Sequence, residues 1–291
     1  VPDLVAEELL ENEEIDEDLL DEILGGTQAD EPDPPDDQKP SRQALEAVPR
    51  EVERNTGAEL AHPTDRVQLQ VVGVDRDRIT MIDSRGIVRD GRAGVDAYKA
   101  AFARPANDPR RTLADAMRGA DVLIGLSSGG RVPSELLKSM NKNPIVFVLA
   151  NPDPEVPYDE AVAMRPDAIV ATGRSDFPNQ VNNVLGFPFI FRGALDVAAT
   201  SINEEMKLAA ARALAGLARE PVPEVVCEAY GGEALAFGPR YIIPKPVDPR
   251  VLPWVSSAVA QAAIETGVAQ EPLDIAAYRV RLTQKAGLTS S

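Results

Sequence analysis

The stretch of residues 171–196, ATGRSDFPNQVNNVLGFPFIFRGALD, carries the side chains of this sequence best suited to binding a ligand. Four side-chain amides fall within five residues of it, Asn179, Gln180, Asn182 and Asn183. An apolar block follows them at once. An amide offers both a donor and an acceptor, which suits a carboxylate, a ribose hydroxyl or a carboxamide. A buried amide must be hydrogen-bonded. The residues alone leave two interpretations open, a ligand-binding loop and an ordinary Asn-rich turn.

A short apolar run precedes this loop, and three more such runs each precede another polar loop. We expect these runs to be the strands that position the polar side chains of the loops. The runs are Ile79–Ile82, Val122–Leu126, Ile145–Leu149 and Ala168–Ala171. Their spacing of roughly 20–45 residues leaves room for a helix between each pair, which predicts a parallel sheet built from βαβ units. The runs are apolar throughout, as in strands that are covered on both faces.

Helices are predicted between and after the runs. The candidates are Ala93–Phe102 or Thr112–Met117, then Pro133–Met140, Tyr158–Met164, Ile202–Leu217, Asp248–Thr266 and Leu273–Leu282. In the helix ending at Leu217, apolar residues recur at helical spacing on one face. Ser201 and Glu204 stand at the spacing of a capping box before it, which predicts the start of that helix.

In an open parallel sheet, ligands bind beyond the carboxyl ends of the strands. The first run ends in Asp83, Ser84, Arg85 and Gly86. An acidic side chain at such a strand end accepts hydrogen bonds from a ribose hydroxyl. The same four residues are equally typical of a β-turn.

The next two strand ends also carry small or amide residues. Ser127, Ser128 and Gly129 follow the second run, where small residues let the backbone approach a phosphate. Asn151 follows the third run, in a loop that two prolines stiffen. Since the amide-rich loop follows the fourth run, the four strand ends together predict a cleft.

The charge of the chain is concentrated at one end. Residues 1–37 contain 16 Asp or Glu and no Lys or Arg, out of 47 acids and 30 bases in the whole chain. Residues 38–291 are therefore nearly neutral and show no basic stripe, which argues against a nucleic-acid-binding protein. We expect residues 1–66 to be an acidic helix over 3–24 and a disordered Pro-rich linker, and residues 67–291 to be the folded domain.

Several other classes of protein are excluded by what the sequence lacks. Cys227 is the only cysteine and His62 the only histidine, so neither a disulfide framework nor a Ser-His-Asp triad is expected. No apolar run approaches about 20 residues, and residues 1–24 are acidic where a signal peptide is basic, so we expect a cytoplasmic protein that binds no membrane. No G-x-G-x-x-G turn and no metal-ligating cluster occur.

Residues 68–284 resemble the C-terminal, dinucleotide-binding domain of bacterial malic enzymes. The matching segments, in family order, are MIDSRGIV, GRAGVDAYKAAFAR, ADVLIGLSSGGRVPSELLKSM, PIVFVLANPDPE, ATGRSDFPNQVNNVLGFPFIFRGALD, INEEMKLAAARALA and FGPRYIIPKPVDPR. The resemblance implies a Rossmann-like α/β fold, a mostly parallel sheet with flanking helices. The sheet would be incomplete at its N-terminal βα unit, because the glycine-rich turn of that unit is missing.

The resemblance also implies an activity and a set of site residues. The family converts malate to pyruvate and CO2 by oxidative decarboxylation, using NAD or NADP and a divalent metal. The implied cofactor-binding residues are Asp83 and Ser84 near the adenosine ribose, Ser127, Ser128 and Gly129 beside the cofactor, and Asn151 at the nicotinamide ribose. Asn182 would hold the nicotinamide end, and Asn183 would bind a carboxylate of the substrate.

The catalytic half of the family does not carry over. In malic enzymes an upstream domain supplies a Tyr, a Lys and the acidic metal ligands. Here no tyrosine precedes Tyr98, and Lys39 is the only lysine before Lys99. We therefore expect no catalytic residue and no metal ligand, and a chain that carries the cofactor-binding half and is inactive alone. A nucleotide- or small-acid-binding module and a non-functional remnant are the alternatives, and a homo-oligomer is compatible with each.

Overall fold

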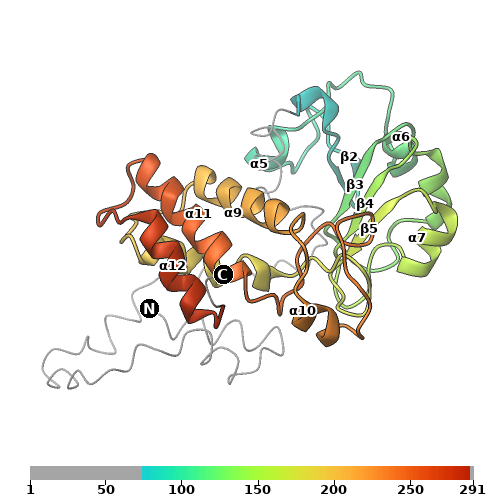
Figure 1. Cartoon of the computed structure of the whole chain (residues 1–291). Coiled ribbons are helices and arrows are strands. Elements are labelled where there is room, and N and C mark those ends of the chain that lie inside the picture. Colours follow the sequence, from blue (N-terminus) through green and yellow to red (C-terminus); the bar gives the residue numbers. More distant parts are fainter. Residues whose placement is uncertain (1–73, 289–291) are drawn as a thin grey trace, which may run out of the picture. The chain divides into compact units, whose positions relative to one another are not determined.

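The computed structural model describes residues 74–288 (Figure 1). The expected acidic helix over residues 3–24 and the expected domain boundary after residue 66 lie outside the described residues. Both stay predictions from the sequence.

Three parallel strands form the main sheet, in the order β3 (Val122–Gly125), β4 (Ile145–Val148) and β5 (Ile169–Thr172). The pairs run in register from Val122 to Gly125 along β3, with Gly125 opposite Val148 and Val148 opposite Thr172. β-Branched and aromatic residues fill β4 and β5, and such residues favour strands. The three runs predicted as parallel strands are confirmed.

The first apolar run does not join this sheet. β1 (Ile82–Asp83) pairs antiparallel with β2 (Gly86–Ile87) in a separate two-stranded sheet. Gly86 has a φ of +97°, and the backbone N–H of Arg85 donates to Asp83 Oδ1 at 2.9 Å. These features close a tight turn back onto the preceding residues. The prediction of a parallel strand at residues 79–82 is wrong, and the β-turn interpretation of the residues that follow is correct.

The connections between the parallel strands carry short helices that pack on the sheet. A 3₁₀-helix, η3 (Ser134–Ser139), lies between β3 and β4, and α7 (Tyr158–Met164) lies between β4 and β5. Both contact α6 (Leu113–Met117) or the sheet, and side chains such as Leu137, Val146 and Val170 are buried among them. The α7 bounds agree with the prediction, whereas residues 133–140 adopt the tighter 3₁₀ form.

The segment before β3 carries two small helices and its own core. η2 (Arg76–Arg78) precedes β1, and α5 (Ala97–Ala100) lies within the predicted helix 93–102. The buried residues of this core are Met81, Val88, Phe102 and Ala103.

Four helices after the sheet form a second, larger core. They are α8 (Phe189–Leu195), α9 (Glu204–Leu217), α11 (Val251–Glu265) and α12 (Ile275–Lys285), with the short α10 (Glu224–Ala229) between α9 and α11. α11 contacts each of the other three, and Figure 1 shows α9 and α12 alongside it. A Cβ on Gly193 of α8 would lie 2.4 Å from the carbonyl oxygen of Ser256, so only glycine permits this approach of α8 to α11. The three predicted long helices are confirmed, whereas α8 and α10 were not predicted.

The start of α9 differs from the prediction. Asn203, not Ser201, is the N-cap, and its Oδ1 accepts from the backbone N–H of Met206 at 3.0 Å. Its Nδ2 donates to Thr266 Oγ1 at 2.8 Å. Because Asn203 satisfies a free N–H of the first turn and also bonds the end of α11, it replaces the predicted capping box.

Within residues 74–288 no helix combines the length and the apolar character that crossing a bilayer requires.

Candidate functional site

The carboxyl edge of the parallel sheet brings three polar loops together. β3, β4 and β5 are adjacent and end in register at Gly125, Val148 and Thr172. The loops that follow them therefore leave from one edge, which is where open α/β sheets bind ligands. Three of the four predicted strand ends meet here.

A buried carboxylate fixes two of these loops relative to each other. Glu155 is fully buried, and its Oε1 accepts from the backbone N–H of Ser127 at 2.6 Å and from Ser127 Oγ at 3.2 Å. Its Oε2 accepts from the backbone N–H of Ala150 at 3.2 Å. A charged acceptor that bonds backbone N–H groups from two strand ends holds both in one position. The sequence reasoning missed Glu155, whose only local signal is an acid directly before the core residue Val156.

Glycines let the loops pack against each other. A Cβ on Gly125 would lie 2.6 Å from the carboxyl carbon of Glu155, and one on Gly129 would lie 2.6 Å from Asp153 Cβ. The backbone N–H of Gly130 donates to the carbonyl of Pro154 at 3.1 Å. The small residues after β3 are therefore required by the neighbouring loop, a reason that the sequence did not supply.

Asn151 lies at the centre of this edge. A Cβ on Gly173, directly after β5, would lie 2.9 Å from Asn151 Oδ1, so the amide rests on the β5 end. The residue is exposed, and among the described residues its amide makes no hydrogen bond. An amide held in place but unpaired is available to a ligand.

The four amides of the loop after β5 divide into two kinds. Asn179 is buried, has a φ of +55°, and donates from Nδ2 to the carbonyl oxygens of Val170 at 2.9 Å and Pro239 at 2.8 Å. Its Oδ1 accepts from the backbone N–H of Ile242 at 2.9 Å. Asn179 is therefore a structural residue that ties β5 to residues 239–242.

Asn182 also serves the backbone, whereas Gln180 is held by its own main chain. Gln180 is buried, its main chain forms a bridge with Thr172 at the end of β5, and its side-chain amide has no hydrogen bond among the described residues. Asn182 caps the 3₁₀-helix η4 (Asn183–Leu185), its Oδ1 accepting from the N–H of Val184 at 3.0 Å. Asn183 differs from them because it is exposed and its amide has no partner among the described residues. The turn interpretation therefore holds for Asn179 and Asn182, and the ligand-binding interpretation stays a prediction for Asn183.

The serines of the β3 loop are partly occupied. Ser127 is held by Glu155, and Ser128 Oγ accepts from Arg131 Nε at 3.0 Å. Both residues are half-buried, whereas Gly129 is exposed. The loop after β3 therefore offers a ligand its fixed backbone groups, because both serine hydroxyls already have partners.

An aromatic stack, which was not predicted from the sequence, also holds the loop after β5. The rings of Tyr158 and Phe177 are stacked with centroids 4.6 Å apart, and Arg174 lies over Phe177 at 5.4 Å. Arg174 also pairs with Asp176 at 2.7 Å. Burial raises the pKa of Tyr158, so its hydroxyl stays neutral. These contacts join the loop to the first turn of α7.

Asp83 and Ser84 lie in the β1–β2 hairpin and not at a parallel strand end. Arg92 forms an ion pair with Asp83, with Nη1 to Oδ1 at 3.0 Å. Burial favours the neutral carboxyl, but hydrogen bonds from the Arg92 side chain and the Arg85 backbone hold the pKa of Asp83 below its usual value. Ser84 is exposed at the turn.

The described residues do not fit a divalent metal. Within residues 74–288 no group of three or more His, Cys, Asp or Glu side chains lies close enough to hold an ion. The expectation that this chain lacks the metal ligands stays a prediction from the sequence.

The parallel strands, flanking helices and polar loops at one edge define a Rossmann-like α/β domain, as predicted. A family model described as "Malic enzyme, NAD binding domain" matches residues 73–226. The chain is 56% identical over 204 residues to the NADP-dependent malic enzyme of Halomonas elongata, covering 70% of this chain and 48% of that protein. It is 51% identical over 218 residues to an NAD-dependent malic enzyme of Rhizobium meliloti, covering 74% of this chain and 28% of that protein.

A solved structure agrees with these similarities. The malic enzyme of Entamoeba histolytica matches with a TM-score of 0.66 at 36% identity, covering 77% of this chain and 45% of that one. The chain belongs to the malic enzyme family. It spans about half the length of the Halomonas relative and less of the Rhizobium one.

Proposed function

We propose that residues 74–288 bind NAD or NADP as the cofactor half of a malic enzyme, which oxidatively decarboxylates malate to pyruvate and CO2. One observation carries the proposal. Asn151 and Asn183 expose unpaired amides on loops that leave the same sheet edge, while the neighbouring Asn179 and Asn182 are used by the backbone. Family membership supports a nicotinamide dinucleotide as the ligand.

The proposed contacts follow the loops. The backbone of Ser127, Ser128 and Gly129 would line the cofactor, in the position that Glu155 fixes. Asn151 would bond the nicotinamide ribose. The Nδ2 of Asn182, whose Oδ1 already caps η4, would hold the nicotinamide end, and Asn183 would bind a carboxylate of malate.

The adenosine end of the cofactor is proposed to lie near Asp83 and Ser84. Ser84 is exposed and can donate to a ribose hydroxyl. Asp83 already pairs with Arg92, so a ribose would share its carboxylate with that guanidinium.

Bound NAD or NADP would supply the hydride-accepting chemistry of the reaction, and the protein would supply the position of the reactants. The residues described here would bind and orient the cofactor and one substrate carboxylate. We propose that proton transfer and metal ligation come from the other half of the enzyme, and that this chain does not turn over malate alone. A small acid is the expected substrate, and homo-oligomerisation would be one way to complete a site.

Two measurements on the full chain test this proposal. Fluorescence titration with NADH and with NADPH should show saturable binding of at least one, and the ratio of the two affinities gives the cofactor preference. An assay with malate, NAD or NADP and Mn²⁺ should show no turnover. Absence of saturable binding for both nucleotides would contradict the cofactor assignment, and turnover would contradict the division of labour.

A further inference from the structure

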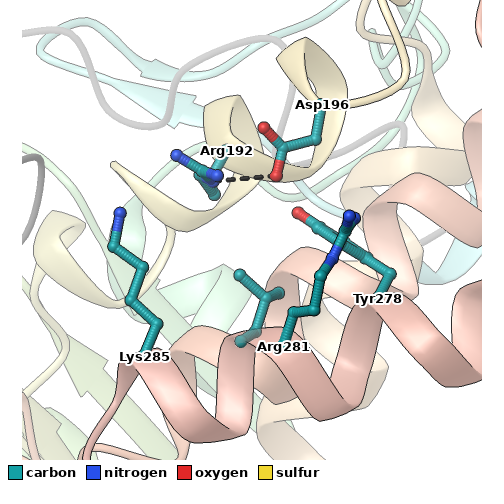
Figure 2. A pocket seen from close by; sticks show the side chains of 6 residues that line it. Arg192, Asp196, Tyr278, Arg281 and Lys285 are labelled. Atoms are coloured by element: carbon teal, nitrogen blue, oxygen red, sulfur yellow. Dashed lines mark hydrogen bonds and ion pairs between the residues drawn. The ribbon is translucent and has the colours of Figure 1, made fainter. Parts of the chain in front are cut away.

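A pocket of about 410 Å³ lies between α8 and α12, and positive charge dominates it (Figure 2). It is lined by Arg192, Asp196, Tyr278, Arg281, Leu282 and Lys285. Three cationic side chains thus face one carboxylate. No residue proposed for the cofactor lines this pocket.

Helix geometry gathers these side chains. Arg192 and Asp196 are four residues apart on α8, and Tyr278, Arg281 and Lys285 follow at spacings of three and four on α12. Residues at such spacings share one face of a helix. Figure 2 shows the two groups on facing helices, with Lys285 extending toward α8.

The positive charge of the pocket is only partly neutralised. Arg192 Nε pairs with Asp196 Oδ2 at 2.8 Å, so its two terminal nitrogens are not used by this ion pair, and the guanidinium also lies close to the Tyr278 hydroxyl. Arg281 lies over the Tyr278 ring at 5.6 Å. Within residues 74–288, neither Arg281 nor Lys285 has a carboxylate within ion-pair distance. The net charge of the lining is therefore positive by two.

A buried hydroxyl at the pocket lacks a well-aligned partner. Tyr278 is 2% exposed, and its hydroxyl oxygen makes no hydrogen bond of ordinary geometry among the described residues, although the Asp196 carboxylate and the Arg192 guanidinium lie close to it. Burial, and then the nearby Asp196 carboxylate, raise the pKa of Tyr278, so the hydroxyl remains protonated and is a donor. Leaving such a group unpaired disfavours the folded state. Arg281 and Lys285 are exposed, whereas the Tyr278 hydroxyl beside them is buried.

We infer that this pocket binds a small dianion of the phosphate or dicarboxylate class. Guanidinium groups match the paired oxygens of both, the ammonium of Lys285 adds a third positive contact, and the Tyr278 hydroxyl donates a hydrogen bond to a ligand oxygen. A dianion would neutralise the surplus charge of the lining, whereas a monoanion would leave part of it.

Calorimetric titration of the full chain with inorganic phosphate and with succinate tests the inference. Ionic strength is held constant with chloride, because a merely diffuse attraction is screened by salt. We expect saturable binding of at least one of the two, and which one binds separates the phosphate class from the dicarboxylate class. Absence of saturable binding for both overturns the inference.

Substitutions locate the binding. Arg281→Gln and Lys285→Gln should each weaken binding about tenfold, the size expected for a hydrogen bond to a charged group. Arg212→Gln is the matched control, because Arg212 is an exposed arginine on α9 that does not line this pocket, and its loss changes the net charge equally. Equal weakening by all three variants would overturn the inference.

Tyr278→Phe separates binding from structure. The variant keeps the buried ring and removes only the unpaired hydroxyl, so the melting temperature without ligand should stay equal or rise. Affinity for the dianion should nevertheless fall several-fold. A lower melting temperature with unchanged affinity would assign the hydroxyl to folding and overturn its role in binding. Because no nicotinamide nucleotide is used, this result is independent of the proposed cofactor site.

Discussion

Neighbouring asparagines in the loop after β5 have opposite roles. The side-chain amide of Asn179 forms hydrogen bonds with three backbone groups. Its φ lies in the left-handed region, which Asn tolerates better than most residues. Asn183 is exposed and unpaired among the described residues. The sequence showed that amides were dense here but not which of them were free, because the partners of Asn179 lie at Pro239 and Ile242, about 60 residues away.

Asn179→Ala should destabilise the protein strongly. The change leaves the carbonyls of Val170 and Pro239 and the N–H of Ile242 without this partner and places alanine at a positive φ, which together should lower the free energy of unfolding by about 2–4 kcal/mol. Urea denaturation measures this. A variant as stable as the parent would show that Asn179 is not structural.

Asn183→Ala should leave the stability of the protein almost unchanged and weaken ligand binding instead. Its amide bonds nothing in the described part of the chain, so the free energy of unfolding should change by less than about 0.5 kcal/mol. If Asn183 binds a substrate carboxylate, the rise in melting temperature that malate causes in the presence of NADH or NADPH should shrink. A large loss of stability with the malate effect intact would contradict the assignment.

At the scale of elements, Glu155 connects the ends of β3 and β4. Glu155→Gln replaces one acceptor oxygen by a donor that cannot accept from a backbone N–H, which should cost about 1–3 kcal/mol of stability. Nucleotide affinity should fall as well, because the Ser127 loop loses its fixed position. Glu160→Gln, at an exposed position of α7, is the matched control and should change neither quantity. Equal effects of both variants would contradict the connecting role.

The capping box of α6 predicts a pH dependence. The side chains of Thr112 and Asp115 each bond a backbone N–H of the other, and backbone hydrogen bonds from Arg111 and Thr112 lower the pKa of Asp115 to about 2. A carboxyl with a lowered folded-state pKa stabilises the fold above its unfolded pKa of about 3.8, and this contribution is lost as the pH falls toward 2.

Asp115→Asn should therefore be less stable than the parent at pH 6, and the difference should narrow as the pH falls below about 4. Urea midpoints of both proteins from pH 6 to pH 3 measure this difference. A gap that is constant or widens with acid would contradict the assigned role of Asp115.

The apolar runs predicted most of the strands, because strands that are covered on both faces must be built from apolar residues. Val122–Leu126, Ile145–Leu149 and Ala168–Ala171 became parallel strands, whereas Ile79–Ile82 did not. The apolar run was alike in all four, but only the first leads into a turn that returns the chain at once, through Gly86 at positive φ. Glu155 was not predicted for a different reason. The groups that donate hydrogen bonds to its carboxylate are brought there by the packing of two loops, which no local sequence pattern indicates.

At the scale of the whole molecule, the chain carries a family domain that the Halomonas and Entamoeba relatives combine with a comparable length of further sequence, and the Rhizobium relative with a longer one. Fold and family could be predicted from sequence because they depend on many short segments in order. The assignment of individual site residues depends on which side chains remain unpaired after folding. Asn151 is the sharpest case, since it rests on the β5 end and yet bonds nothing in residues 74–288.

The most direct test is a titration of NADH and NADPH into the parent chain, Asn151→Ala and Asn107→Ala, followed by nucleotide fluorescence. Asn107 is the matched control, an exposed asparagine between α5 and α6 without a hydrogen bond among the described residues. We predict about tenfold weaker binding for Asn151→Ala, the size expected when one hydrogen bond to the ligand is lost, with Asn107→Ala and the parent alike. Equal affinity in all three proteins would contradict nucleotide binding at this edge of the sheet.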